Sequence, residues 1–196
     1  GRWSEADAFC WHGGGEIRDL LNSCFAVFGR GAIGAETGRL ASLLGMNVIY
    51  AERRDAKHVR PNYVAFDEAL AMADVISLHC PLIDSTQGMI DESAFAKMKR
   101  KPILINCGRG GLVNEMALVK ALNEEQISGA GFDVLSKEPP DTDDPNPFLK
   151  LADRPNVIIT PHVGWASQNA MQEAADMLIG NINAFQAGKP ENVVVI

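Results

Sequence analysis

The stretch Gly29-Arg30-Gly31-Ala32-Ile33-Gly34 decides the fold, because it lies between a predicted strand and a predicted helix. The apolar run before it, Cys24–Phe28, has the length of a buried strand. The segment after it is amphipathic, with Gly45 as its stop. Its apolar positions recur at helical spacing and are Ile33, Leu40, Ala41 and Leu44. A glycine-rich turn from strand to helix predicts the start of a βαβ unit.

Further apolar runs alternate with helical patterns along the rest of the chain. We expect about seven strands, namely Cys24–Phe28, Asn47–Ala51, Tyr63–Ala65, Asp74–Leu78, Pro102–Asn106, Ser128–Asp133 and Asn156–Thr160. Two helices are predicted to begin at Asp91 and Asn114, the first of them ending in the basic stretch Lys97–Arg100. This alternation favours an α/β fold with a doubly wound, Rossmann-type parallel sheet.

Three segments interrupt the alternation and set the expected domain boundaries. Residues 1–22 contain Trp3, Phe9 and Trp11 and are predicted to form a helical arm. Residues 23–166 are expected to form the α/β domain, interrupted by a long proline-rich and acidic loop, Ser136–Pro155. Residues 167–196 form a long C-terminal helix and an apolar tail with no obvious partner in this chain. The apolar helix positions are Ala170, Ala174, Met177, Leu178, Ile182 and Phe185.

The composition excludes several classes of protein. The chain has 196 residues, a formal net charge of −7 and an apolar fraction of 46%, which together argue against a disordered tail or a coiled coil. Its acidity argues against a nucleic-acid or anionic-membrane binder, and no apolar run approaches the ~18 residues of a membrane span. The four scattered cysteines favour free thiols in a reducing compartment, the cytoplasm. The missing initiator Met suggests a fragment.

The glycine-rich turn predicts a dinucleotide site. Gly29 allows the tight turn, Gly31 lets the backbone approach a pyrophosphate, and Gly34 lets the helix pack on the strand. Glu52 follows the second predicted strand, where an acid holds the ribose hydroxyls. NAD is favoured, because a carboxylate repels the 2′-phosphate of NADP. NADP is the alternative if the next two residues, Arg53–Arg54, bind that phosphate, although we favour a solvated pair.

Three candidate catalytic residues follow predicted strands of the same sheet. Arg109 lies in a glycine-flanked turn and could hold a carboxylate substrate with two parallel hydrogen bonds. His162 could transfer a proton near neutral pH, and Glu138 could stabilise its protonated form. Each residue alone has an ordinary structural explanation, but together with the dinucleotide site they favour catalysis. We interpret His79 as a packing residue and Cys107 as a small lining residue.

These segments resemble the D-isomer-specific 2-hydroxyacid dehydrogenases, particularly the glycerate dehydrogenase and hydroxypyruvate reductase branch. The matching segments cover nearly the whole chain and are the glycine turn, His79–Leu82, Ile105–Gly111, Gly131–Pro139 and Thr160–Ser167. The resemblance implies that His162 donates the proton with Glu138 as its partner, and that Arg109 and Trp165 contact the substrate. The cofactor-binding residues that it implies are Gly29, Gly31, Ala32, Ile33, Gly34, Glu52, Cys80, Pro81, Thr86, Cys107, Gly108, Arg109, Asp133, His162 and Gly164.

The implied activity is hydride transfer between NADH and a small 2-keto or 2-hydroxy acid, with hydroxypyruvate and D-glycerate as the favoured pair and no metal required. The alternatives are another dehydrogenase of the family, of phosphoglycerate, D-lactate or formate type, and a non-catalytic NAD-sensing module. Gly108 stands where relatives commonly carry Ala, and the N-terminal substrate domain of the family is absent. We therefore expect a homodimer in which residues 1–22 contribute contacts, and little activity from this chain alone.

Overall fold

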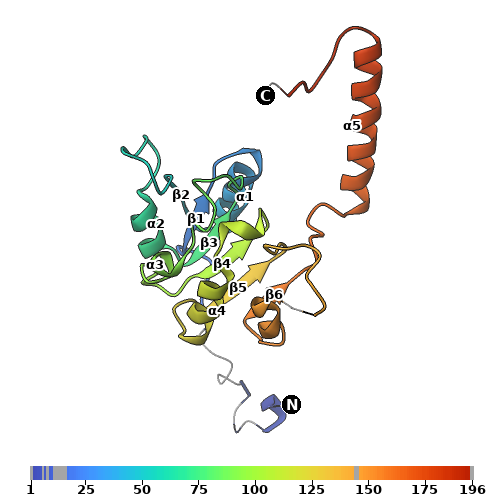
Figure 1. The fold of residues 1–196 in the computed structure, drawn as a ribbon. Helices are drawn as coiled ribbons and strands as arrows, with labels where there is room; N and C mark the ends of the chain where they lie inside the picture. Colours follow the sequence, from blue (N-terminus) through green and yellow to red (C-terminus); the bar gives the residue numbers. More distant parts are fainter. Residues whose placement is uncertain (1, 6, 8, 11–16, 144–145, 195–196) are drawn as a thin grey trace.

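Six parallel strands form one sheet in the order β2-β1-β3-β4-β5-β6 (Figure 1). The computed structural model describes residues 2–5, 7, 9–10, 17–143 and 146–194. The strands are β1 Cys24–Phe28, β2 Asn47–Ala51, β3 Val75–Leu78, β4 Ile103–Asn106, β5 Gly129–Phe132 and β6 Val157–Ile159. The α-helices are α1 Ala32–Leu43, α2 Phe66–Met72, α3 Glu92–Phe95, α4 Glu115–Asn123 and α5 Gln168–Gln186. Three short 3-10 helices are η1 Arg2–Glu5, η2 Gly110–Leu112 and η3 Pro147–Leu151. The predicted doubly wound fold is confirmed.

Alternate residues of β1 belong to two separate cores on the two faces of the sheet. Phe25 and Val27 pack with Ala41 of α1, whereas Ala26 and Phe28 belong to the larger core that includes residues of α2, α3 and α4. The interior strands β1 and β3 are largely buried on both faces, as expected for a parallel sheet. On the face that carries α1, apolar side chains of β4 and β6 stay exposed, with Ile158 at 67%.

Helix α1 packs against the sheet through small residues, and not through the large apolar positions expected from the sequence. Its buried residues are Gly34, Gly38 and Ala41, while Ile33 and Leu40 are exposed. A Cβ atom on Gly38 would lie 2.7 Å from the hydroxyl of Tyr50 in β2, so the helix runs too close to the sheet for a side chain there. The predicted helix and its end at Gly45 are correct, but of the expected apolar positions Ala41 alone is buried.

Two other expected elements differ from the structure. Tyr63–Ala65 is not a seventh strand, because Val64 makes only an isolated bridge to Ala51 at the edge of the sheet. The helix expected from Asp91 to the basic stretch is only one turn, α3, after which the chain continues in turns. Asp91 caps that turn by accepting a hydrogen bond from the Ala94 N–H at 2.9 Å.

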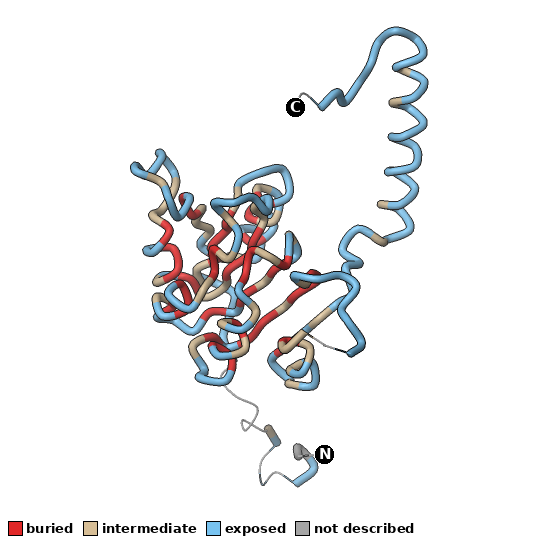
Figure 2. The backbone as a smooth tube through the Cα atoms, viewed as in Figure 1, coloured by how far each residue is buried: buried red, intermediate tan, exposed pale blue. Residues whose placement is uncertain are grey.

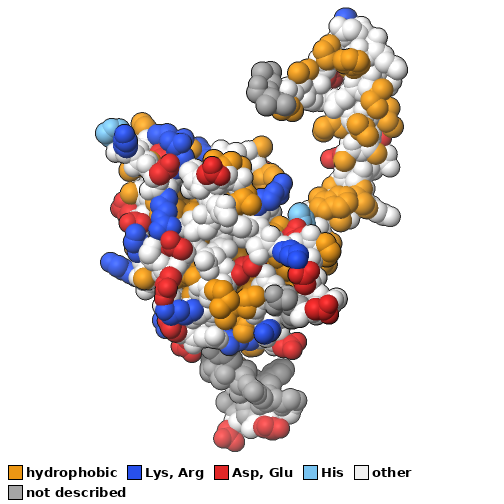
Figure 3. Space-filling model, viewed as in Figure 1, with side chains coloured by type: hydrophobic (Ala, Val, Ile, Leu, Met, Phe, Trp, Pro, Cys, Tyr) orange, Lys and Arg blue, Asp and Glu red, His pale blue; other side chains and the backbone are white. Residues whose placement is uncertain are grey.

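The C-terminal helix α5 stands away from the sheet (Figure 1), and it is mostly exposed with no buried residue (Figure 2). Apolar side chains gather on this helix and on the segment after it (Figure 3), with Phe185 74% and Val194 83% exposed. Of the predicted arm, residues 11–16 and the side chain of Trp3 lie outside the described part, as do the last two residues of the tail. Within the described ranges, no helix is both long and apolar enough to cross a membrane.

β1 pairs with β2 on one side and with β3 on the other, so the strand order reverses between β1 and β3. Open parallel sheets place ligands in the crevice beyond the carboxyl ends of the strands at such a reversal. Gly29 follows β1 and His79 follows β3, and the His79 N–H donates to the Phe28 carbonyl at 2.7 Å. The glycine turn therefore lies at the position where a nucleotide site is expected.

Candidate functional site

The three glycines of the turn differ in what surrounds them. Gly29 has φ +101°, and a Cβ there would lie 2.7 Å from the backbone of His79. A Cβ on Gly34 would lie 2.0 Å from the Gly29 carbonyl oxygen, so both positions are closed by the fold itself. Gly31, the N-cap of α1, has nothing within 4 Å of such a Cβ. The open space at a helix N-terminus is what a pyrophosphate requires.

Glu52 lies at the carboxyl end of β2, and its side chain is held from four directions. The Arg60 guanidinium donates from Nε to Oε2 at 2.7 Å and from Nη2 to Oε1 at 2.8 Å. The backbone N–H groups of Arg53 and Arg60 add bonds of 2.8 and 3.1 Å. These bonds, with Arg60 first among them, lower the pKa of Glu52 from 4.5 to about 2. Glu52 is thus a buried, ionised carboxylate at the expected ribose position.

The arginines that follow Glu52 have different surroundings. Arg54 is partly buried, and it binds both oxygens of Asp91 at 2.9 and 3.3 Å and the Met89 carbonyl at 3.0 Å. Arg54 lies at the surface, as expected, but its charge is paired, and it ties the segment after β2 to the start of α3. Arg53 contributes its backbone N–H to Glu52 and lines the same small cavity as Gly29 and Glu52.

That cavity also brings together two predicted residues from the segment after β3. Cys80 and Thr86 line it with Gly29 and Glu52. The Thr86 hydroxyl bonds to the Pro81 carbonyl at 2.6 Å, which fixes the turn that follows the strand. Burial raises the pKa of the Cys80 thiol. Three of the residues predicted for the adenosine side, Glu52, Cys80 and Thr86, therefore meet at one cavity, whereas Pro81 does not line it.

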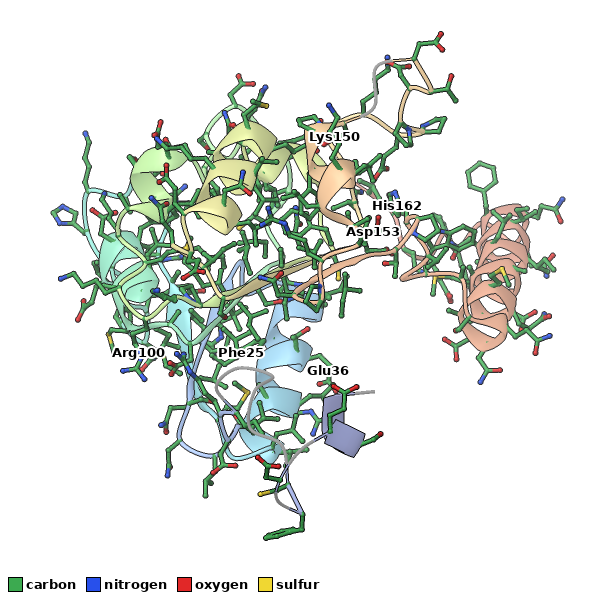
Figure 4. The ribbon with its side chains drawn as sticks, turned by 90° about the horizontal axis from the view of Figure 1, so that it is seen from below. Phe25, Glu36, Arg100, Lys150, Asp153 and His162 are labelled. Atoms are coloured by element: carbon green, nitrogen blue, oxygen red, sulfur yellow. The ribbon has the colours of Figure 1, made fainter. Side chains whose placement is uncertain are left out.

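His162 and Glu138 are in direct contact, with Nδ1 of the histidine 2.6 Å from Oε2 of the glutamate. The other glutamate oxygen accepts the Leu135 N–H at 2.7 Å, which anchors the carboxylate after β5. His162 lies on the segment that leads from the sheet to α5 (Figure 4), and its side chain is 44% exposed. A carboxylate on Nδ1 favours Nε2 as the nitrogen that exchanges a proton with a ligand.

A cavity of about 500 Å³ lies beside this pair and includes Asp133 in its lining. Asp133 follows β5 and is 6% exposed. Its Oδ1 accepts the Thr160 hydroxyl at 2.5 Å and the Val163 N–H at 2.9 Å, and its Oδ2 accepts the Gly164 N–H at 2.8 Å. Burial opposes ionisation of Asp133, but these donors lower its pKa overall. Asp133 therefore organises the turn that carries His162.

The turn after β4 carries Arg109 and is closed by a buried side chain that the sequence analysis missed. Asn106 donates from Nδ2 to the Arg109 carbonyl at 2.9 Å and accepts the Gly108 N–H at 3.1 Å. The Arg109 guanidinium contacts the Gly108 carbonyl at 2.8 Å, and Arg109 shares a cavity with Glu138. The thiol of Cys107 has a raised pKa through partial burial and the charge of Asp133, which suits a lining residue.

The remaining predicted residues lie around these three turns. Ala32 and Ile33 form the first turn of α1, and Ile33 is 74% exposed. Gly164 approaches Asp133 so closely that a Cβ would lie 3.1 Å from Oδ2. Trp165 donates its indole N–H to the His162 carbonyl at 3.0 Å while most of its side chain stays exposed. His79 is a packing residue, as expected, and bonds to the Ser77 hydroxyl at 2.9 Å.

Arg60, Thr160 and Asn106 are the site residues that sequence reasoning missed. A polar residue that ends an apolar run was a usable signal for Asn106, and a hydroxyl two residues before His162 was one for Thr160. Arg60 stands eight residues beyond its partner on an irregular segment, where spacing carries no signal.

The arrangement fits a dinucleotide with a reacting group beside His162. Gly31 and the α1 N-terminus could offer N–H groups to a pyrophosphate, Glu52 lies where a ribose-binding acid is expected after β2, and the His162–Glu138 pair could exchange a proton. Among the residues that the structure describes, no group of three or more His, Cys, Asp and Glu side chains is placed to hold a metal ion.

Residues 2–164 match the family model that describes the NAD binding domain of the D-isomer specific 2-hydroxyacid dehydrogenases. The chain is 46% identical to the glycerate dehydrogenase of Methylorubrum extorquens over 196 residues, covering 99% of the chain and 59% of that protein. It is 44% identical to a putative 2-hydroxyacid dehydrogenase of Haemophilus influenzae over 184 residues, covering 94% and 58%. It therefore spans little more than half the length of these relatives.

Solved structures agree. The NAD-complexed D-isomer specific 2-hydroxyacid dehydrogenase of Lactobacillus delbrueckii ssp. bulgaricus superposes with a TM-score of 0.84 at 30% identity, covering 100% of this chain and 62% of that one. On its fold, its glycine turn and these likenesses, the chain belongs to the D-isomer specific 2-hydroxyacid dehydrogenase family and comprises its NAD-binding domain.

Proposed function

We propose that the protein containing this chain reduces a small 2-keto acid with NADH, with hydroxypyruvate as the substrate and D-glycerate as the product. The observation that carries the proposal is the 2.6 Å contact between His162 Nδ1 and Glu138. This pair and the Glu52 and Gly31 site both lie beyond the carboxyl ends of the parallel strands. The 46% identical glycerate dehydrogenase and a 38% identical hydroxypyruvate reductase of Blautia hydrogenotrophica support the choice of substrate.

Gly31 and Glu52 would hold the dinucleotide, whose nicotinamide would supply the hydride that reduces the keto carbon. His162 supplies the proton to the keto oxygen from Nε2, because Nδ1 is engaged with Glu138. Glu138 stabilises the positive charge of the protonated imidazole and fixes its orientation through its bond to the Leu135 N–H. Deprotonated His162 takes the proton back in the reverse reaction.

Arg109 binds the substrate carboxylate and polarises the keto oxygen in this proposal. Its guanidinium can form two parallel hydrogen bonds to a carboxylate. The cavity that it shares with Glu138 supports this role, because it brings the guanidinium near the proton-transfer pair. Asp133 would hold the nicotinamide carboxamide, because its Oδ2 accepts only one bond from the described protein groups whereas Oδ1 accepts two. Trp165 borders the substrate beside His162.

A second candidate function is a non-catalytic NAD-binding module. Other dehydrogenases of the family are a further alternative, since phosphoglycerate dehydrogenases and glyoxylate reductases are among the relatives at 35–39% identity. Turnover with hydroxypyruvate, compared with glyoxylate, pyruvate and 3-phosphohydroxypyruvate on the whole protein, separates these functions. Hydroxypyruvate should give the highest kcat/KM.

We further propose that residues 1–22 and 167–196 contact parts of the protein beyond this chain. The exposed apolar side chains of α5 and of the sheet face at Ile158 support this, because a surface of this kind is normally covered. We propose a cytoplasmic homodimer with residues 1–22 in its contact, and little activity for residues 1–196 alone. Hydroxypyruvate reduction at normal rates by this chain would contradict the last point.

The proposed role of His162 has a direct test in the whole protein. His162→Ala should lower kcat by about 10²–10⁴ while leaving the NADH dissociation constant within a few fold, because the imidazole acts in proton transfer. His58→Ala is the matched control, since His58 is an exposed histidine after β2. Near-normal turnover in His162→Ala would remove His162 from the mechanism.

A further inference from the structure

The Arg60 guanidinium covers the carboxylate that the cofactor site offers to a ribose. It approaches Glu52 in a bidentate arrangement, with bonds of 2.7 and 2.8 Å to the two oxygens. The Glu52 side chain is 2% exposed, whereas that of Arg60 is 56% exposed. The cavity is therefore lined by an ion pair, in which the positively charged Arg60 is the more exposed partner.

This pairing changes how strongly the Glu52 carboxylate can favour a ribose hydroxyl over a 2′-phosphate. A bare carboxylate accepts ribose hydroxyls and repels a 2′-phosphate. A guanidinium on both oxygens cancels most of that repulsion and competes with the hydroxyls for the same lone pairs. Arg60 is also exposed enough to turn from Glu52 to a phosphate, for which its planar donors are well suited.

The surroundings of Arg60 favour an anion. The Arg60 guanidinium stacks on the Tyr63 ring at 3.9 Å, and that of Arg30 stacks on Tyr50 at 4.3 Å. The charged residues that line the cavity are Arg30, Arg53, Arg54, Arg60, Glu52 and Asp55. Arg54 is paired with Asp91. Even without it, the three remaining arginines of the lining outnumber the two acids.

We propose that Arg60 is a specificity-determining residue that lets this domain accept NADPH as well as NADH. The proposal rests on the proposed function, since it concerns the same nucleotide site. With NADH bound, the ribose hydroxyls share the Glu52 oxygens with Arg60. With NADPH bound, Arg60 turns its guanidinium to the 2′-phosphate and offsets the charge of Glu52.

The opposite role is also testable. If Arg60 served only to orient Glu52 as a ribose ligand, its removal would weaken NADH binding more than NADPH binding. If Arg60 relaxes discrimination, its removal exposes the full charge of Glu52 to the 2′-phosphate and weakens NADPH binding more. The two roles predict changes of opposite sign in one ratio.

The experiment titrates residues 1–196 with NADH and with NADPH, by nucleotide fluorescence, and compares the two dissociation constants. Arg60→Ala should raise the ratio of Kd for NADPH to Kd for NADH by about tenfold or more, which equals ~1.4 kcal/mol. Arg60→Lys keeps a charge but loses the planar fork and should raise the ratio less. Arg39→Ala is the matched control, because Arg39 forms a bidentate pair with Glu36 on α1, outside the cavity.

The outcomes separate this proposal from the proposed function. An unchanged or lower ratio in Arg60→Ala, with both nucleotides still bound, overturns the role of Arg60 and leaves the nucleotide site standing. If the unaltered chain binds neither nucleotide, both proposals fail. Circular dichroism checks folding, and if Arg60→Ala does not fold, Arg60→Lys decides by whether the ratio rises.

Discussion

The carboxylate of Asp133 holds the left-handed turn that carries His162. His162 has φ +54°, which costs a non-glycine residue roughly 1–2 kcal/mol. Its N–H donates to the Asp133 carbonyl at 2.8 Å, and the next two N–H groups, of Val163 and Gly164, donate to the two carboxylate oxygens. The same carboxylate faces the proposed nicotinamide side, so one residue organises both the cofactor contact and the proton donor.

The Thr160 hydroxyl completes this arrangement, and its removal should weaken it. Thr160→Val keeps the shape of the side chain but deletes the donor to Asp133 at 2.5 Å. Leaving a nearly buried carboxylate short of a donor should lower the free energy of unfolding by about 1–3 kcal/mol. Urea unfolding of the chain measures this. Thr160→Ser keeps the hydroxyl and should cost less than ~1 kcal/mol, and equal losses in both variants would show that the hydroxyl is unimportant.

Gly31 and Gly34 should respond in opposite ways to substitution by alanine. Gly34→Ala places a Cβ 2.0 Å from the Gly29 carbonyl oxygen and should cost about 1–3 kcal/mol of stability or more. Gly31→Ala meets no atom within 4 Å, so the fold should lose less than ~1 kcal/mol. NADH affinity should nevertheless fall by about tenfold, because the methyl group stands where the pyrophosphate approaches. Thermal unfolding and NADH titration check both variants, and undiminished NADH affinity in Gly31→Ala would contradict the site.

The residues that could be predicted from the sequence are those whose roles are set within a few neighbours. The glycine turn, Glu52 after β2 and Asn114 as the cap of α4 follow from local backbone chemistry. The buried face of α1 could not be predicted from apolar spacing, because the helix approaches the sheet so closely that only small residues such as Gly38 fit. The pairing of Arg60 with Glu52 depends on the path of an irregular segment, which no periodic pattern encodes.

We expected His162 and Glu138 to act together because both follow strands of the same sheet, and the family resemblance implies the same pairing. The two residues are 24 positions apart and are joined through the long segment after β5, so spacing alone does not predict their approach. The short α3 has a physical explanation as well. Arg54 and Ser93 both bind Asp91 at the start of that helix, which stabilises one capped turn without extending it.

Acid should destabilise the domain partly through Glu52. Its pKa in the folded chain is about 2 against an ordinary value of 4.5, because Arg60 and the Arg53 N–H bind the ionised form. A lowered pKa contributes stability that is fully present above the ordinary value and is lost as the pH falls from about 4.5 toward 2. Glu52→Gln should therefore lose less stability than the unaltered chain over that interval, measured as the urea midpoint against pH. Glu173→Gln on the exposed α5 is the control and should match the unaltered chain.

Asn106 should position Arg109 through both atoms of its amide. Asn106→Asp keeps an oxygen for the Gly108 N–H but turns the donor toward the Arg109 carbonyl into a second acceptor, at a site that is 0% exposed. We expect a loss of about 1–3 kcal/mol in the free energy of unfolding. In the whole protein, KM for the keto acid should rise while the NADH dissociation constant stays within a few fold, because Arg109 is displaced and Glu52 is not. Asn106→Ser retains a donor and an acceptor, so its KM for the keto acid should lie between those of Asn106→Asp and the unaltered protein. Equal changes in keto-acid KM and NADH affinity would instead indicate a general loss of structure at the end of β4.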